Sequence, residues 1–70
     1  MEKTFKKGNY EISFKLTNNA LHGYIDNVTN YNRVITFTVY DNKKVAYDFP
    51  EQLPKYIKQY TEQLAKKIEF

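Results

Sequence analysis

The 70-residue chain contains no cysteine and no tryptophan, and only two glycines, two prolines and one histidine. Without cysteine it has no disulfide, no thiolate zinc site and no thiol nucleophile. The single histidine, His22, cannot build a histidine-pair metal site or a catalytic triad. The two glycines, Gly8 and Gly23, form no phosphate-cradling loop. We therefore expect a protein without metal, cofactor or enzymatic activity.

Long apolar runs are also missing. No stretch approaches the ~18 apolar residues that span a bilayer, and no charged leader precedes an apolar segment with a cleavage site. We expect a cytoplasmic protein that does not associate with membranes. A chain of 70 residues supports one hydrophobic core, so we expect a single domain over residues 1–70. A core of this size supplies only ~3–5 kcal/mol, and a homodimer would enlarge it.

Positive charge is in modest excess. The net charge is +3, and every cationic side chain except Arg33 is a lysine, which favours loose attraction to polyanions over bidentate recognition of bases. The same abundance of Lys, Asn, Ile, Tyr and Phe is also what an AT-rich genome encodes by codon bias. The lysines therefore indicate either a polyanionic partner or ancestry, and the sequence leaves both interpretations open.

Alternation of apolar and polar residues, together with a run of β-branched and aromatic residues at Arg33–Tyr40, predicts four strands. The strands are expected at Tyr10–Leu16, Leu21–Asp26, Arg33–Tyr40 and Val45–Phe49. Hairpin turns are expected at Thr17–Ala20 and Asp41–Lys44, where Asn and Asp tolerate tight turn geometry, and a loop at Asn27–Asn32. Gly23, which has no side chain to pack, predicts a bulge or a place where another chain approaches closely. Residues 1–7 are expected to form a flexible basic arm.

The apolar period changes near the C-terminus. Leu53, Tyr56, Ile57, Tyr60, Leu64 and Ile68 share one helical stripe. Pro54 fits the first helical turn, where its missing amide hydrogen costs nothing, so we predict an amphipathic helix over about 54–68. The element order is ββββα, which predicts an α+β fold: a four-stranded antiparallel meander sheet with one C-terminal helix across one face.

One side of this predicted sheet carries the candidate binding residues. Pairing the first two strands aligns Glu11, Ser13, Lys15, His22, Tyr24 and Asp26 on the side opposite the apolar stripe. Single-strand binders stack bases on aromatic rings and attract phosphates with lysines. The residues that fit these roles are Tyr24, Tyr40, Lys15, Lys43 and Lys44. Alternatively, these tyrosines simply pack against cross-strand neighbours and keep their hydroxyls in water.

The segment Lys43–Leu53, which reads Lys-Lys-Val-Ala-Tyr-Asp-Phe-Pro-Glu-Gln-Leu, resembles the last strand and helix start of the transcriptional positive-cofactor family of single-stranded DNA binders. That family has a four-stranded curved sheet and a C-terminal helix, so the resemblance extends to the element order. It implies single-stranded DNA binding by a dimer. Only Lys43 and Lys44 match positions that the family uses for backbone contacts.

Two functions remain open from the sequence. The first is a non-catalytic nucleic-acid-binding module that recognises single-stranded DNA through a basic, tyrosine-bearing sheet face. The alternative is a small protein of the phage or mobile-element type that binds and inhibits a host or defence protein. Such an inhibitor needs only a stable miniature sheet, and a short chain without evident chemistry fits that requirement.

Overall fold

A computed structural model describes residues 1–29 and 32–70 and shows five strands and one α-helix. The strands are β1 (Glu2–Lys7), β2 (Tyr10–Thr17), β3 (Ala20–Asn27), β4 (Asn32–Val39) and β5 (Val45–Tyr47). A 3₁₀ turn, η1 (Pro50–Gln52), leads into the helix α1 (Lys55–Lys67). The predicted loop at 27–32 lies partly outside the described residues.

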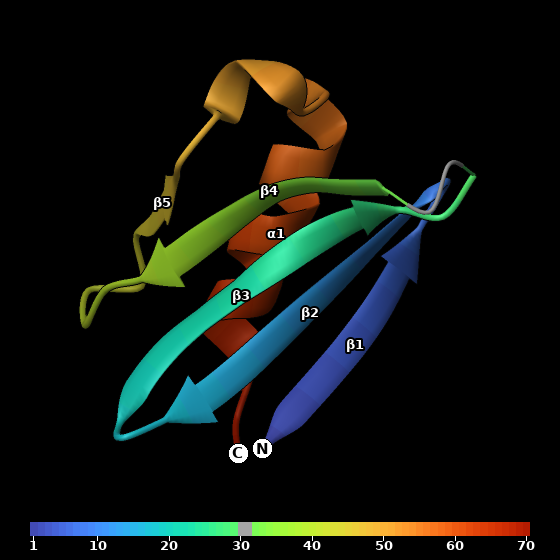
Figure 1. Ribbon diagram of the computed structural model, residues 1–70. Coiled ribbons are helices and arrows are strands. Elements are labelled where there is room, and N and C mark those ends of the chain that lie inside the picture. Colours follow the sequence, from blue (N-terminus) through green and yellow to red (C-terminus); the bar gives the residue numbers. More distant parts are fainter. Residues whose placement is uncertain (30–31) are drawn as a thin grey trace.

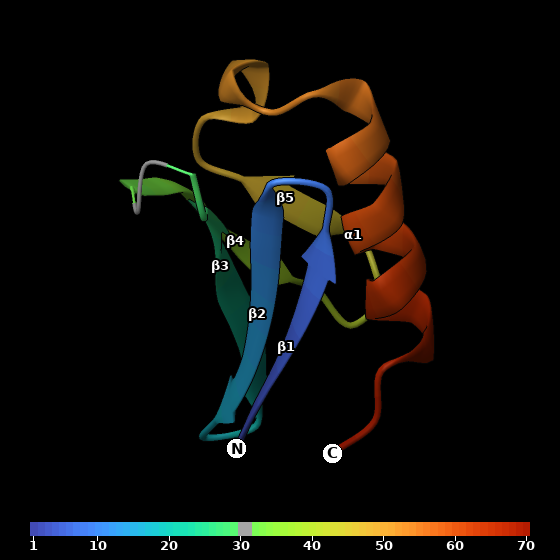
Figure 2. The same cartoon turned by 90° about the vertical axis from the view of Figure 1, so that its right-hand side faces the viewer.

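The five strands form one antiparallel sheet in the order β1-β2-β3-β4-β5, so each strand pairs with its neighbours in the chain (Figure 1). The α1 helix lies against one face of this sheet, and no described helix or strand covers the other face (Figure 2). The α+β meander predicted from the sequence is therefore correct in class, but the sheet has five strands and not four.

The additional strand is β1. Residues 1–7 are not a flexible arm, because Glu2–Lys7 pairs in register with Lys15–Tyr10 of β2 along its whole length. Among the helix-facing residues of β1 only Phe5 is apolar, so the alternation of apolar and polar residues does not predict this strand. The other two are lysines whose ammonium groups lie over aromatic rings, Lys3 at 5.4 Å from Phe70 and Lys7 at 5.2 Å from Tyr60. Their aliphatic stems thus take the place of apolar side chains.

The core lies between the sheet and α1. Ile12, Phe14 and Ile25 have no exposed surface, and Ile35 and Phe37 are almost fully buried. These residues come from β2, β3 and β4, where the alternation in the sequence is strongest. The period of two therefore gathers these apolar side chains on one side of the sheet, and the structure shows that this is the side that the helix covers.

Local chemistry explains two of the connections. Asn18 and Asn19 adopt φ angles of 51° and 64°, which is the left-handed geometry of a two-residue β-hairpin turn. Gly23 meets a close approach: a Cβ there would overlap the Ser13 carbonyl oxygen and lie 2.6 Å from Phe37 Cζ. The register shift between β3 and β4 does not lie at Gly23 but between Ile25 and Asp26.

The helix packs with a slightly different stripe from the predicted one. Ile57, Thr61 and Ala65 are its buried residues, whereas Tyr56 is 49% exposed. Thr61 is accommodated in the core because its hydroxyl donates a hydrogen bond of 2.8 Å to the Ile57 carbonyl oxygen. Within residues 1–29 and 32–70, no helix has the length and apolar character needed to cross a membrane.

Candidate binding face

The sheet surface opposite α1, called the open face below, is built from three cross-strand rows. The upper row is Lys6, Glu11, Asp26 and Arg33, the middle row is Thr4, Ser13, Tyr24 and Thr36, and the lower row is Glu2, Lys15, His22 and Thr38. Asp48, just after β5, joins the middle row through Thr36. The six polar residues that the sequence places together from β2 and β3 do share this face.

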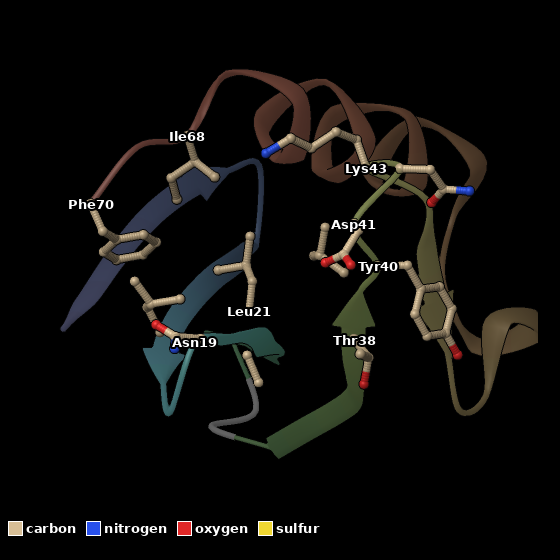
Figure 3. Close-up of a pocket in the computed structure, with 12 residues that line it drawn as sticks. Asn19, Leu21, Thr38, Tyr40, Asp41, Lys43, Ile68 and Phe70 are labelled. Atoms are coloured by element: carbon tan, nitrogen blue, oxygen red, sulfur yellow. The ribbon is translucent and has the colours of Figure 1, made fainter.

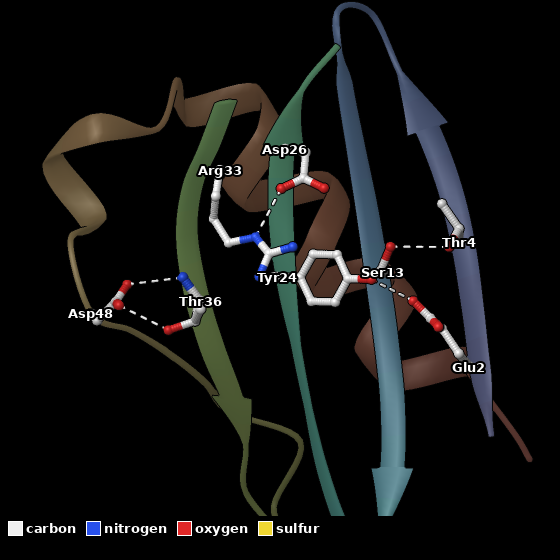
Figure 4. A network of polar contacts seen from close by, with 8 residues as sticks. All are labelled: Glu2, Thr4, Ser13, Tyr24, Asp26, Arg33, Thr36 and Asp48. Atoms are coloured by element: carbon white, nitrogen blue, oxygen red, sulfur yellow. Dashed lines mark hydrogen bonds and ion pairs between the residues drawn. The ribbon is translucent and has the colours of Figure 1, made fainter. Parts of the chain in front are cut away.

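Tyr24 occupies the centre of the open face and is held by charged neighbours (Figure 4). The Arg33 guanidinium carbon lies 3.9 Å from the centre of the Tyr24 ring, and the Lys15 ammonium lies 5.6 Å from it. Arg33 is itself oriented by Asp26, whose Oδ1 accepts a 3.0 Å hydrogen bond from Arg33 Nε. The Arg33 guanidinium is thus fixed by stacking on Tyr24 and by the ion pair with Asp26. The Arg33 side chain remains 55% exposed.

The hydroxyl end of Tyr24 is fixed by β1. It donates a 2.6 Å hydrogen bond to Glu2 Oε2. Chiefly because of this hydrogen bond to a carboxylate, the pKa of Tyr24 is raised above its ordinary value. The aromatic ring therefore lies across the face under two cations and is not presented as a bare stacking platform.

Two further contacts make the middle row rigid. Ser13 is buried, although it faces the open side, and its hydroxyl shares a 3.0 Å hydrogen bond with Thr4. At the opposite edge, the Asp48 carboxylate accepts hydrogen bonds from the Thr36 backbone amide at 3.1 Å and from the Thr36 hydroxyl at 2.8 Å. These hydrogen bonds from Thr36 are the main reason that the pKa of Asp48 is lowered. Asp48 thus continues the pairing of β4 beyond the short β5.

The charge of the open face is nearly balanced. It carries three cations, Lys6, Lys15 and Arg33, and four carboxylates, Glu2, Glu11, Asp26 and Asp48. The whole chain has 11 cationic and 8 acidic side chains, so the excess of positive charge lies elsewhere. It lies on the helix, the turns and the helix-facing side of β1. The face that carries the central tyrosine is therefore not the basic surface expected from the sequence, because most lysines belong to other surfaces.

Of the five sequence-predicted site residues, the structure places two on the open face, Lys15 and Tyr24. Tyr40 and Lys43 line a surface cleft of about 810 Å³ at the end of the sheet, between the β4–β5 turn and the C-terminal segment (Figure 3). The cleft also contains Leu21, Ile68 and Phe70. Tyr40 is 56% exposed there.

Lys43 and Lys44 project toward the helix. Both line a hollow that also includes Glu62 and Lys66 of α1. Tyr24, by contrast, pairs with Thr36 in the middle of β4. The β4–β5 turn therefore does not place its two lysines beside the Tyr24 ring. The direction in which the turn projects is set by its conformation, in which Lys43 takes a φ of 70°.

The sequence does not reveal two important members of the face. Glu2 is missed because β1 lacks an apolar alternation. Arg33 is recognised as the start of a strand, but the register shift between Ile25 and Asp26 decides that it faces Asp26 and Tyr24. The available signal is the single arginine in a lysine-rich chain, since Arg is the cation suited to stacking and to oriented carboxylate pairing.

The fold and this face define a class: a five-stranded antiparallel meander with a C-terminal helix on one side and a preorganised polar surface on the other. Comparisons with protein-family models, with curated proteins and with solved structures found no match to this chain.

Proposed function

We propose that this protein is a non-catalytic binding module whose open face docks on the surface of another protein. The observation that carries this proposal is the cluster in which Tyr24 is held by Arg33, Lys15 and Glu2 within a charge-balanced surface. Tyrosine and arginine are the residues that most often dominate protein interfaces. Their fixed positions reduce the conformational entropy that binding costs.

A protein partner fits the open face better than a nucleic acid does. Four carboxylates on this surface would repel phosphates, and Arg33 covers the Tyr24 ring on which a base would stack. A protein surface can instead supply a complementary charge for each of these groups. A module of this kind acts by occupying its partner's surface, which is how a small inhibitor of a host or defence protein would work.

Nucleic-acid binding is a second candidate, supported by the two cations beside Tyr24 and by the net charge of +3. It differs from the first candidate in its salt dependence, because phosphate contacts release counterions and their affinity falls steeply as salt rises.

Capture from a bacterial lysate treated with nuclease tests the proposal. The variant Arg33→Ala removes the central cation, and Lys58→Ala removes a cation from α1 as the matched control. We expect the parent protein and Lys58→Ala to retain the same partner protein, and Arg33→Ala to lose it. Capture that nuclease abolishes, or that both variants retain equally, would contradict the proposed function.

A further inference from the structure

The rows of the open face have a symmetry that identifies one partner. On β1 and β2 the residue in the middle row is uncharged, and the residues two positions to either side carry opposite charges. These flanking pairs are Glu2 and Lys6, and Lys15 and Glu11. The register of the sheet puts each pair at equal distances from the middle row.

We infer that the open face binds a second copy of this chain, related by a two-fold axis that runs across the strands along the middle row. This rotation places each strand opposite its own copy and exchanges the upper and lower rows. Glu11 of one copy then faces Lys15 of the other, Lys6 faces Glu2, and Tyr24 faces Tyr24. The inference rests on the proposed function, that this face binds protein, and names the partner.

The charges that would meet form no ion pairs with one another within one copy. Across the part of the chain that the structure describes, the ion pair between Arg33 and Asp26 is the one within 4.0 Å. Lys6 and Glu11 are cross-strand neighbours but form no such pair, and the same holds for Glu2 and Lys15. Two sheets packed about 10 Å apart bring long Lys and Glu side chains of opposite copies within reach of each other.

The proposed axis sets one like pair, Asp48 and its own copy, opposite each other at the β5 edge, because Asp48 lies in the middle row. The alternative two-fold axis, along the strands, is less favourable in charge. It would place Lys6 opposite Arg33 and Glu11 opposite Asp26, so like charges would meet. The pattern of charges thus selects one arrangement of the two copies and not merely an association of sheets.

The size of the face limits the strength of this dimer. With overall extents of 31 × 21 × 19 Å, one copy offers a face smaller than the ~800 Å² per partner of a standard interface. We therefore expect a weak dimer that is populated only at high protein concentration. Its affinity should fall further with salt because the contacts are between partly exposed charges. At lower concentrations the open face is free for another protein.

Sedimentation equilibrium up to about 1 mM protein, in 20 mM and in 500 mM NaCl, tests the arrangement by reversing charges. Glu11→Lys alone sets two lysines against each other across the axis, and Lys15→Glu alone sets two glutamates together, so each single variant should dimerise at least tenfold more weakly. An equimolar mixture of the two variants should associate as a heterodimer, and the double variant, which carries both changes, should recover self-association to within about threefold. Lys66→Glu on α1 is the control and should behave as the parent.

Each outcome is informative. A parent protein that stays monomeric in 20 mM NaCl would overturn the inference, while the proposed function would still stand if Arg33→Ala lost a captured partner. Self-association that the single variants do not weaken, or that the mixture does not restore, would place the dimer on another surface and also overturn it. A dimer that the charge reversals weaken would support the inference even if Arg33→Ala retained every captured protein. That retention would contradict only the proposal that the open face docks on a different protein.

Discussion

The two faces of this sheet solve different physical problems with the same strands. The helix-covered face is a close-packed apolar layer in which Phe14 and Phe37 meet edge to face at 5.2 Å, and it supplies the stability. The open face is held by directed contacts, such as that between Tyr24 and Glu2, and contributes little hydrophobic burial. The difference indicates that side chains on the open face can be changed with little loss of stability.

The largest effect is expected on the covered face. Phe37 is 3% exposed and packs against Phe14 and Tyr47, so Phe37→Ala should destabilise the fold by about 3–5 kcal/mol, enough to unfold a domain of this size. Phe37→Leu, which leaves a smaller cavity, should still fold, with a loss of about 1–2 kcal/mol. The control Thr38→Ala, next in the strand but exposed on the open face, should change the free energy of unfolding by under about 0.5 kcal/mol. Circular dichroism shows whether Phe37→Ala is folded, and urea denaturation measures the other two variants. A similar loss for Phe37→Leu and Thr38→Ala would remove the distinction between the faces.

The second effect tests how tightly the covered face is packed. Gly23→Ala adds a single methyl group that would overlap the Ser13 carbonyl oxygen and press on the Phe37 ring. We expect a loss of about 2–3 kcal/mol by overpacking, although alanine has the better backbone entropy. The matched control is Ala46→Gly on β5, which removes a methyl group and should cost about 1 kcal/mol or less. A thermal midpoint for Gly23→Ala equal to that of the parent would show that the approach of Phe37 can relax freely.

Much of this division can be predicted from the sequence. Alternation from Tyr10 to Leu16 assigns a strand and groups its apolar side chains on one side, because a period of two leaves one choice of face. The β-branched and aromatic residues from Arg33 to Tyr40 assign a second strand, while the sequence leaves open which face of the sheet the helix covers. The helix follows from the change in period at Leu53. The class of fold can therefore be predicted from the sequence alone.

The remaining features depend on geometry that one sequence does not encode locally. Lys3 and Lys7 face the helix side through cation–π contacts with Phe70 and Tyr60, and these rings lie more than 50 residues away along the chain. A charged residue in an inward position conceals β1, and with it Glu2. For the candidate site, Lys15 and Tyr24 follow from strand register, whereas Lys43 depends on the direction of a turn.

A third, smaller effect distinguishes directed contacts on the open face from surface charge. Asp48→Asn removes the carboxylate that accepts two hydrogen bonds from Thr36, and should cost about 1 kcal/mol at pH 7. Because the pKa of Asp48 is lowered in the folded state, its carboxylate stabilises the fold above the ordinary aspartate pKa of 3.8. That contribution is lost as pH falls through the folded-state pKa.

The difference in unfolding free energy between the parent protein and Asp48→Asn should therefore shrink progressively below about pH 4. Urea denaturation at pH 7 and at lower pH values measures this difference. Asp41→Asn, which removes a carboxylate from the β4–β5 turn, is the control for the loss of one negative charge and should change the free energy of unfolding by under about 0.5 kcal/mol at pH 7. A pH-independent cost for Asp48→Asn would show that the contact with Thr36 does not depend on the carboxylate charge.

The smallest effect concerns the lysines outside the open face. Lys43 and Lys44 share a hollow with Lys66. One double variant changes Lys43 and Lys44 to Ala, and the other changes Lys66 and Lys67 to Ala. The two variants therefore remove equal charge from neighbouring parts of the helix side. Binding to a fluorescent single-stranded oligonucleotide at about 50 mM salt should fall alike for both, by less than about tenfold, with similar reductions in salt slope. The sequence alone predicts a larger loss for the turn lysines, because a hairpin turn is expected to project them beside Tyr24.

Lys15→Ala sharpens the test, since Lys15 is the lysine that lies over the Tyr24 ring. If this single change weakened oligonucleotide binding more than either double variant, the nucleic acid would lie on the open face and the division between the two surfaces would fail.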